Sequence, residues 1–225
     1  MIPGFFITAT ATGAGKTYVT RALSLALRQA GRHPAAIKPA ETGVVGDPLD
    51  ALALARACNR PRLTRAAGLY RAALPLSPYA ASLEDGIACP EPAALAAVIL
   101  DLAADADCLL VEGAGGLLVP LTATASMADL ARELALPLLI VAPDQLGVLS
   151  SVLTCVESAS ARKLDVAAVI LSARAPNTDD PSPRTNRRIL QERLSAPVLS
   201  FPFCSDDDVA LADAARNCGL LALMR

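Results

Sequence analysis

The sequence predicts an α/β fold in which helices flank both faces of a mostly parallel sheet. Three observations carry this prediction. Short apolar runs alternate along the chain with segments of helical periodicity. The composition is 53% hydrophobic but only 3% aromatic, without tryptophan, as suits aliphatic strands buried between helices. A loop of small residues joins the first apolar run to the first helical segment, near the N-terminus.

The elements follow in order along the chain. Strands are predicted at residues 5–8, 35–38, 108–111, 138–141, 166–171 and 198–200, and helices at residues 16–30, 95–104, 146–163 and 209–217. The first helix places Val19, Leu23, Ala26 and Leu27 on one face. Residues 64–92 and 173–184, rich in proline or in Pro, Asp and Asn, are predicted to be long loops. Without a linker, residues 1–225 are expected to form a single domain.

Charge and composition exclude several classes of function. A net charge of −2 gives no electrostatic reason to expect a nucleic-acid partner. No apolar run reaches the roughly 20 residues needed to cross a bilayer, and the N-terminus lacks the features of a signal peptide. Six widely spaced cysteines and a single histidine argue against a zinc site. A cytoplasmic protein with reduced thiols and no membrane partner is therefore expected.

The first loop, Thr8 to Thr17, has the composition of a phosphate-binding loop. Successive backbone N–H groups of Thr12, Gly13, Ala14 and Gly15 can wrap a phosphate chain at the positive end of the following helix. Lys16 then reaches the β- and γ-phosphates of ATP, and the Thr17 hydroxyl binds Mg²⁺. Counted from Ala9, the loop is one residue longer than the commonest pattern, and alanine stands where glycine is usual.

Charged residues follow two other predicted strands. Glu112 ends an apolar strand and precedes four small residues, which favours a Mg²⁺ ligand over a strand cap in solvent. Lys38 follows the second strand, where it either neutralises an anionic substrate or is an ordinary solvated lysine; position alone does not separate the two. Asp50 either caps the next helix or reaches the metal, and Asp47 competes with it as the cap.

Two further polar features are assigned no chemistry. His33 lies in a turn after the first helix and is expected at the surface. Residues 206–208 are three aspartates before the last helix, where favourable charge at a helix N-terminus explains them better than metal binding does.

Several motifs in this order resemble those of dethiobiotin synthetases, which are P-loop ATP-dependent ligases. They are the T-x-T-x-x-G-K-T loop at residues 10–17, K-P-x-x-T-G at 38–43 followed by Asp50-Ala51, S-P-Y-A-A at 77–81, and E-G-A-G-G at 112–116. A fifth match is A-D-L-A at 128–131, continued through Leu136-Pro137 and Leu146-Gly147 to Leu153-Thr154. The K-P-x-x-T-G and E-G-A-G-G motifs are far more specific than a phosphate loop.

The resemblance implies a homodimer that uses ATP and Mg²⁺ to join CO₂ to 7,8-diaminononanoate and close a cyclic urea, through a carbamate and a carbamic-phosphoric anhydride. It assigns catalysis to Lys16 and Lys38, the metal to Thr17, Asp50 and Glu112, and substrate binding to Thr42, Gly147 and Val148. The nucleotide is expected to contact the phosphate loop, Gly113, Ala114, Gly115, Ser172, Pro202, Phe203 and Cys204.

The chain departs from the family pattern at several places. Ala11 and Gly13 stand where acidic residues are often found, and Tyr79 replaces a common histidine. The stretch Gly147 to Ser151 differs from the family's L-G-T-I-N-H segment, which binds the carboxylate tail of the substrate across the dimer. Ser172 replaces an asparagine that contacts the base.

Two other functions share this type of fold. An amidoligase of the cobyrinic acid diamide synthase type usually carries an additional glutamine-hydrolysing domain, for which 225 residues leave no room. A partition or division-site ATPase typically has a signature lysine in the loop, at the position that Ala11 occupies here. It also needs a basic or amphipathic surface for DNA or membrane, and none is visible.

Overall fold

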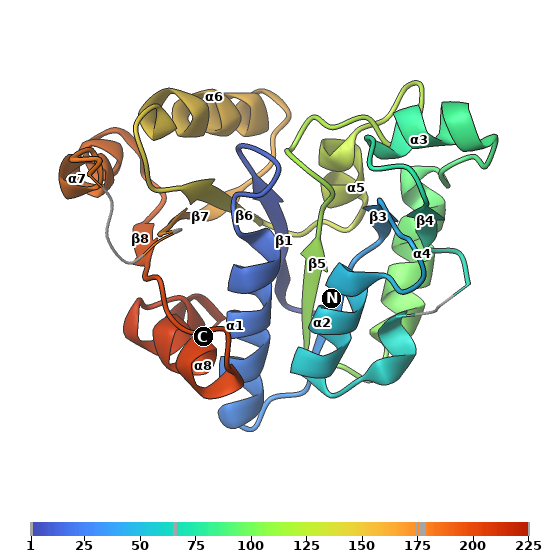
Figure 1. Cartoon of the computed structure of the whole chain (residues 1–225), viewed down its shortest axis with the longest axis horizontal. Coiled ribbons are helices and arrows are strands. Elements are labelled where there is room, and N and C mark those ends of the chain that lie inside the picture. The colour runs from blue at the N-terminus through green and yellow to red at the C-terminus, as the bar shows by residue number, and fades with distance from the viewer. Residues whose placement is uncertain (1, 65–66, 174, 176–178, 225) are drawn as a thin grey trace.

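A six-stranded parallel sheet forms the centre of the computed structural model, which describes residues 2–64, 67–173, 175 and 179–224 (Figure 1). Every neighbouring pair of strands is parallel, which confirms the predicted fold class. In spatial order the strands are β2 (Pro34–Ile37), β5 (Cys108–Glu112), β1 (Gly4–Ala9), β6 (Leu138–Pro143), β7 (Val166–Ser172) and β8 (Val198–Phe201). All six were predicted from their apolar runs.

Helices cover both faces of this sheet because side chains of a strand alternate between the faces. Ile7 of β1 packs into an apolar cluster with α1 (Lys16–Gln29), α2 (Leu49–Cys58) and α8 (Asp208–Asn217). Phe6 packs into the cluster on the opposite face, which includes side chains of α4 (Pro92–Leu102), α5 (Met127–Glu133), α6 (Val148–Ala161) and α7 (Pro183–Arg193). Figure 1 shows α1, α2 and α8 together on one side of the sheet.

The predicted helices near residues 16–30, 95–104, 146–163 and 209–217 correspond to α1, α4, α6 and α8, with ends that differ by up to three residues. The expected inner face of α1 is confirmed, since Val19, Leu23, Ala26 and Leu27 are all buried. Asp207 caps α8 by accepting a hydrogen bond from the Ala210 N–H at 2.9 Å, as the aspartate run indicated. His33 is exposed, as expected.

The prediction of one long loop over residues 64–92 was wrong. The part outside residues 65–66 contains β4 (Tyr70–Ala72) and α3 (Pro78–Asp85). Strand β4 pairs in parallel with β3 (Ala40–Thr42) to form a second, two-stranded sheet. Three-residue strands carry little periodicity of their own, so their pairing depends on the tertiary structure. The prolines read as loop signals include Pro78, which starts α3 behind the N-cap Ser77.

The second predicted loop, residues 173–184, is only partly covered by the structure. Residues 174 and 176–178 lie outside the described part of the chain, and helix α7 begins at Pro183. Sequence periodicity missed this helix because its buried face is so narrow that only Asn186 and Leu190 are buried. Within the described residues, no helix has the length and apolar character that a membrane span requires.

The parallel order of the strands positions the functional residues. The carboxyl ends of β1, β2 and β5 meet at one edge of the sheet, where the three strands lie side by side in the order β2, β5, β1. The phosphate loop follows β1, Lys38 follows β2, and Glu112 is the last residue of β5. Side chains separated by up to about a hundred residues in the sequence are therefore brought to one place.

Helix α5 begins with a capping box, in which the Asp129 carboxylate reaches back to the N-cap residue Ser126. Asp129 Oδ2 accepts hydrogen bonds from the Ser126 backbone N–H at 2.8 Å and the Ser126 hydroxyl at 2.7 Å. Partial burial by itself would raise the pKa of Asp129, but these hydrogen bonds and the Arg132 guanidinium lower it.

We predict that Asp129→Asn lowers the free energy of unfolding by about 1 kcal/mol at neutral pH, because one charged acceptor at the helix N-terminus is lost. The native pKa of Asp129 lies below its ordinary value. Its stabilisation is therefore complete above the ordinary value and disappears as the pH falls through the native value. Urea unfolding at pH 7 and at pH 3 measures both effects. A variant as stable as the native chain at pH 7 would contradict the prediction.

Candidate active site

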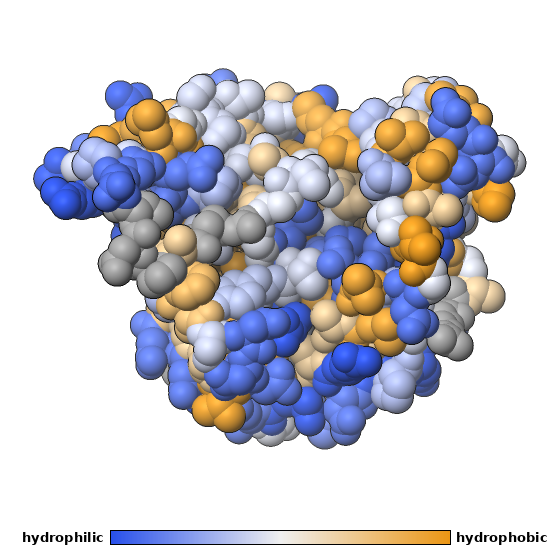
Figure 2. All heavy atoms as spheres, in the orientation of Figure 1, coloured by the Kyte–Doolittle hydropathy of each residue, from blue (hydrophilic) through white to orange (hydrophobic). Residues whose placement is uncertain are grey.

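A cavity of about 410 Å³ opens at the carboxyl ends of β1, β2 and β5. Its lining comes from the phosphate loop, the segment after β2, the start of α2 and the segment after β5. The space-filling view shows a hydrophilic, hollowed region in the middle of the same face, with apolar side chains more frequent toward its edges (Figure 2). This is where open parallel sheets bind ligands.

The phosphate loop joins the end of β1 to the start of α1. Gly13 and Gly15 have positive φ angles, +72° and +99°, which turn the backbone toward the cavity at little cost only because these residues lack a Cβ. Helix α1 begins at Lys16, and no side chain caps its N-terminus. The first N–H groups of α1 and its positive dipole end are therefore available to an anion such as a phosphate.

Lys38 lies between two carboxylates in this cavity. Its Nζ donates to Glu112 Oε1 at 2.6 Å and to Asp50 Oδ2 at 2.8 Å. The Thr17 hydroxyl donates to the same Glu112 Oε1 at 2.8 Å. Four residues from four separate segments thus form one hydrogen-bonded cluster, in which the Glu112 side chain is fully buried.

Comparison with known proteins identifies the family. Residues 3–201 match the family model described as an AAA domain. The ATP-dependent dethiobiotin synthetase of Anaeromyxobacter dehalogenans is 39% identical over 220 residues, which are 96% of this chain and 95% of that protein. The enzyme of the same name from Aromatoleum aromaticum is 37% identical over 97% of this chain and 96% of that protein. The chain belongs to the ATP-dependent dethiobiotin synthetase family.

Solved structures agree on the fold. The cell division ATPase MinD of Pyrococcus furiosus superimposes with a TM-score of 0.60, covering 98% of this chain and all of that one, at 17% identity. A ParA family ATPase from Chlorobium tepidum gives a TM-score of 0.56 at 15% identity, over 99% of this chain and 93% of that one. At such identities the likeness shows a shared P-loop fold and says nothing about function.

In this member of the dethiobiotin synthetase family, the pKa values of the two lysines that line the cavity shift in opposite directions. Burial alone would lower the pKa of Lys38, but the charges of Glu112 and Asp50 outweigh it and raise that pKa. Burial, helped by the charge of Lys38, lowers the pKa of Lys16 to about 8. Burial would raise the pKa of Asp50, but the charge and hydrogen bond of Lys38 hold it below its ordinary value. Lys38 and Asp50 are thus a charged pair.

The same residues fit a Mg²⁺ ion that is shared with a nucleotide. Glu112 Oε2 is buried and has no hydrogen-bond partner within the described part of the chain, so one carboxylate oxygen is available. Asp50 and the Thr17 hydroxyl add further oxygens, which are the ligands that Mg²⁺ prefers. Within the described ranges, no three His, Cys, Asp or Glu side chains gather to hold a metal by themselves. A site of this kind needs phosphate oxygens to complete it, as Mg²⁺ sites in nucleotide-binding proteins usually do.

The other predicted nucleotide contacts fall in two places. Ala114 and Gly115 line the same cavity, and Gly113 supports it by donating its N–H to the Ile7 carbonyl at 2.9 Å. Ser172, Phe203 and Cys204 line a separate cavity of about 360 Å³ on the other side of Gly15. The structure places Pro202 at the surface, outside the lining of that second cavity.

The predicted substrate contacts are less close together. Thr42 lines the main cavity and donates its hydroxyl hydrogen to the Leu76 carbonyl at 2.7 Å. Gly147 and Val148 lie at the N-terminus of α6, outside the lining of the main cavity within one chain. The next turn of α6 carries Ser151, which lines a groove of about 600 Å³ together with Thr10 and Thr12 of the phosphate loop.

Sequence reasoning missed three residues that line the cavity, Tyr18, Ala40 and Glu41, and of these Glu41 is the charged one. Its carboxylate accepts hydrogen bonds from the backbone N–H groups of Asp50 and Ala51, at 2.8 and 3.0 Å. Neither of the two aspartates considered as caps is the N-cap of α2, because the helix begins at Leu49, directly after Pro48. The sequence signal for Glu41 was weak: it is a charged residue three positions after Lys38, in a strand-like segment.

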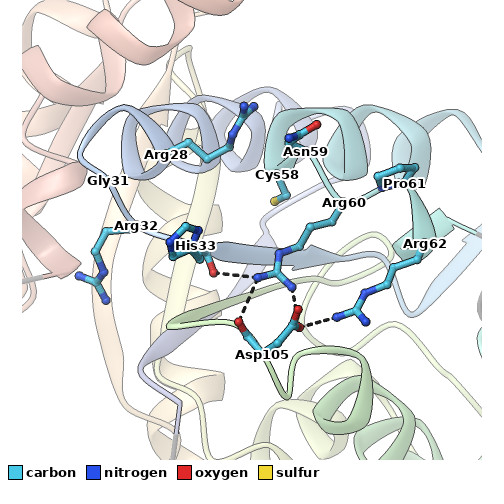
Figure 3. A pocket seen from close by; sticks show the side chains of 10 residues that line it. All are labelled: Arg28, Gly31, Arg32, His33, Cys58, Asn59, Arg60, Pro61, Arg62 and Asp105. Atoms are coloured by element: carbon cyan, nitrogen blue, oxygen red, sulfur yellow. Dashed lines mark hydrogen bonds and ion pairs between the residues drawn. The ribbon is translucent and has the colours of Figure 1, made fainter.

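A larger cavity of about 690 Å³ lies among the ends of α1 and α2 and the turn before β5 (Figure 3). Its arginines are used by the protein itself. Arg60 and Arg62 both pair with Asp105, and Arg28 donates to the Ala57 carbonyl at the end of α2. In Figure 3 the Arg28 and Arg32 guanidinium groups point away from this pair, so the cations do not converge on one ligand position. The cavity at the phosphate loop therefore remains the candidate active site.

We predict that Gly15→Ala weakens ATP binding by at least about tenfold. A left-handed backbone costs a residue with a Cβ about 1–2 kcal/mol, and the new Cβ would lie 3.0 Å from Ser172 Oγ. Titration calorimetry with MgATP measures the affinity. The matched control is Gly31→Ala, which has a similar φ of +78° but open space around the added methyl group, outside the lining of the site. Equal ATP affinity in the Gly15 and Gly31 variants would disprove the structural role of Gly15.

Proposed function

We propose that this chain, as one ligase domain over residues 1–225, catalyses the ATP- and Mg²⁺-dependent carboxylation and ring closure of 7,8-diaminononanoate with CO₂. The products are dethiobiotin, ADP and phosphate. One observation carries the proposal: the Lys38 ammonium is held by Asp50 and Glu112 beside the phosphate loop, in a chain that belongs to the dethiobiotin synthetase family.

The arrangement of charges suits this reaction because two anions, a carbamate and a triphosphate, must approach each other. Lys16 and Lys38 are two of the three lysines in the chain, and both line the cavity. We assign to them the neutralisation of the carbamate and of the transferred phosphoryl group, together with the uncapped N-terminus of α1. A Mg²⁺ ion held by Thr17, Asp50 and Glu112 would add charge neutralisation on the phosphates.

Substrate and nucleotide would enter from different sides of the loop. We assign the diamine to the main cavity near Thr42, and the base to the second cavity, lined by Ser172, Phe203 and Cys204. Gly113, Ala114 and Gly115 would contact the nucleotide from β5. Since Ser172 Oγ is buried without a hydrogen-bond partner among the described residues, it is free to accept or donate one to a ligand.

A homodimer would bring the remaining substrate contacts into place. Gly147 and Val148 begin α6, and Leu146, directly before them, is 80% exposed. Leu118, on the rim of the groove next to α6, is 46% exposed. A second copy that covers this apolar surface would bring the start of its own α6 to the cavity of the first.

We expect Leu146→Arg to shift the protein to monomers in sedimentation velocity and to raise the KM for the diamine. An unchanged sedimentation coefficient would contradict this arrangement.

We also propose a cytoplasmic location without a nucleic-acid or membrane partner. All six cysteines are free thiols, which is consistent with a reducing compartment. The reaction needs only ATP, Mg²⁺, bicarbonate or CO₂, and the diamine.

The direct test is release of phosphate from ATP in the presence of Mg²⁺ and bicarbonate, with and without 7,8-diaminononanoate. The product mass is read in parallel. Phosphate release that depends on the diamine, together with formation of the cyclic urea, is the expected result. ATP binding without stimulation by the diamine would restrict the proposal to a ligase of this fold that acts on another substrate.

We predict that Lys38→Ala lowers product formation by at least about 100-fold, as loss of a charge-stabilising group in an active site does. Nucleotide binding is expected to stay largely intact, because the Lys38 ammonium donates to Asp50 and Glu112 and to no residue of the phosphate loop. The matched control is Lys163→Ala, which changes the exposed third lysine at the end of α6. Turnover by Lys38→Ala at the native rate would remove Lys38 from the catalytic residues.

A further inference from the structure

The N-terminus of α2 is capped by a side chain from another element. Pro48, in the N-cap position, has no side-chain oxygen to accept the first free N–H groups of the helix. Glu41 of β3 takes over this function, with Oε1 2.8 Å from the Asp50 nitrogen and Oε2 3.0 Å from the Ala51 nitrogen. These are the second and third N–H groups of α2, the two that an N-cap side chain normally satisfies.

Glu41 is only 7% exposed, and positive groups lie near its carboxylate. The positive end of α2 faces it, and Arg71 of β4 is its direct partner in the parallel pairing of β3 with β4. Burial lowers the pKa of Arg71, and the charge of Glu41 counteracts this effect. The Glu41 carboxylate therefore binds the positive end of α2 and lies within electrostatic range of Arg71.

Glu41 and Lys38 together hold Asp50 at both ends. Lys38 donates to the Asp50 carboxylate at 2.8 Å, and Glu41 accepts the Asp50 backbone N–H. The two holding residues are three positions apart in the sequence. The short segment between β2 and the end of β3 thus determines where the first turn of α2 lies and in which direction its carboxylate points.

We propose that Glu41 is a positioning residue for the metal: it fixes the first turn of α2, so that Asp50 presents its carboxylate to a Mg²⁺ ion bound with ATP. This inference rests on the Mg²⁺ and ATP site of the proposed function. Both Glu41 oxygens accept main-chain N–H groups of α2, so we assign its action to Asp50 and not to the ion. Residues that orient a metal ligand typically contribute 10- to 100-fold to metal affinity.

The test compares Glu41→Ala with a rescue variant that caps α2 locally. Pro48 has an extended backbone, with φ −76° and ψ +96°, in which a serine side chain can cap the helix. The double variant Glu41→Ala/Pro48→Ser therefore restores a cap without restoring the carboxylate. The control Asp129→Asn changes a capping carboxylate on α5, away from the cavity lining.

The measurement is titration calorimetry with β,γ-methylene-ATP at increasing MgCl₂ concentrations, using the full-length chain. Glu41→Ala should need about tenfold more Mg²⁺ for half-maximal tightening of nucleotide binding. Its affinity for the nucleotide without Mg²⁺ should equal that of the native chain. Pro48→Ser should return most of the lost Mg²⁺ response, and Asp129→Asn should bind as the native chain does.

Two results would overturn the inference. A native Mg²⁺ response in Glu41→Ala shows that the cap does not position Asp50. The second result is a lowered Mg²⁺ response in Glu41→Ala that the added Pro48→Ser does not restore, although the far-UV circular dichroism is native. That result shows that Glu41 contacts the ligand itself. If Glu41→Ala does not fold, Glu41→Gln takes its place, because it keeps the shape and one acceptor. This experiment measures nucleotide and Mg²⁺ binding and not product formation, so its result does not depend on whether the diamine reacts.

Discussion

The structure depends on one buried cation between two carboxylates. Glu112 is fully buried at the end of a central strand, where an unpaired carboxylate would be strongly unfavourable. The Lys38 ammonium compensates it and also binds Asp50, so β5, the segment after β2 and α2 are joined at a single nitrogen atom. With Thr17 on the same Glu112 oxygen, the start of α1 is included as well.

Lys16 lines the same cavity, so two ammonium groups, Lys16 and Lys38, face the two carboxylates of this cluster, Asp50 and Glu112. The chain thus keeps the groups for a highly charged ligand in place by pairing them with each other. In the proposed complex with ATP and Mg²⁺, the carboxylate oxygens that now accept from the ammonium would serve the metal. The charged state of Lys38 is secured before any ligand arrives, since its carboxylate neighbours raise its pKa.

Much of this site could be predicted from the sequence, and the limits have physical reasons. The phosphate loop is a local feature, so its strand, small residues and helix can be read directly. Lys38 and Glu112 could be placed together because parallel strands end at the same edge of a sheet. Asp50 and Asp47 could not be separated, because the helix cap comes from Glu41, which no local pattern connects to α2.

Elements held by tertiary contacts were missed for a similar reason. Strands β3 and β4 have three residues each and exist as a pair, 30 residues apart in the sequence. The residues at the start of α6 were assigned to the substrate by family resemblance, yet within one chain they lie outside the main cavity. A sequence does not state which of its surfaces a second copy covers.

The second, two-stranded sheet has a consequence for how such an enzyme can change. The groups that handle phosphate are anchored on the central sheet, which also carries the core. Thr42, by contrast, lies on β3, which pairs with β4 apart from the six central strands. A substitution at Thr42 changes the lining of the cavity and leaves the core residues of the same two strands, Ala40, Tyr70 and Ala72, in place. The cavity can therefore vary at its β3 side while the phosphate loop on the central sheet stays fixed.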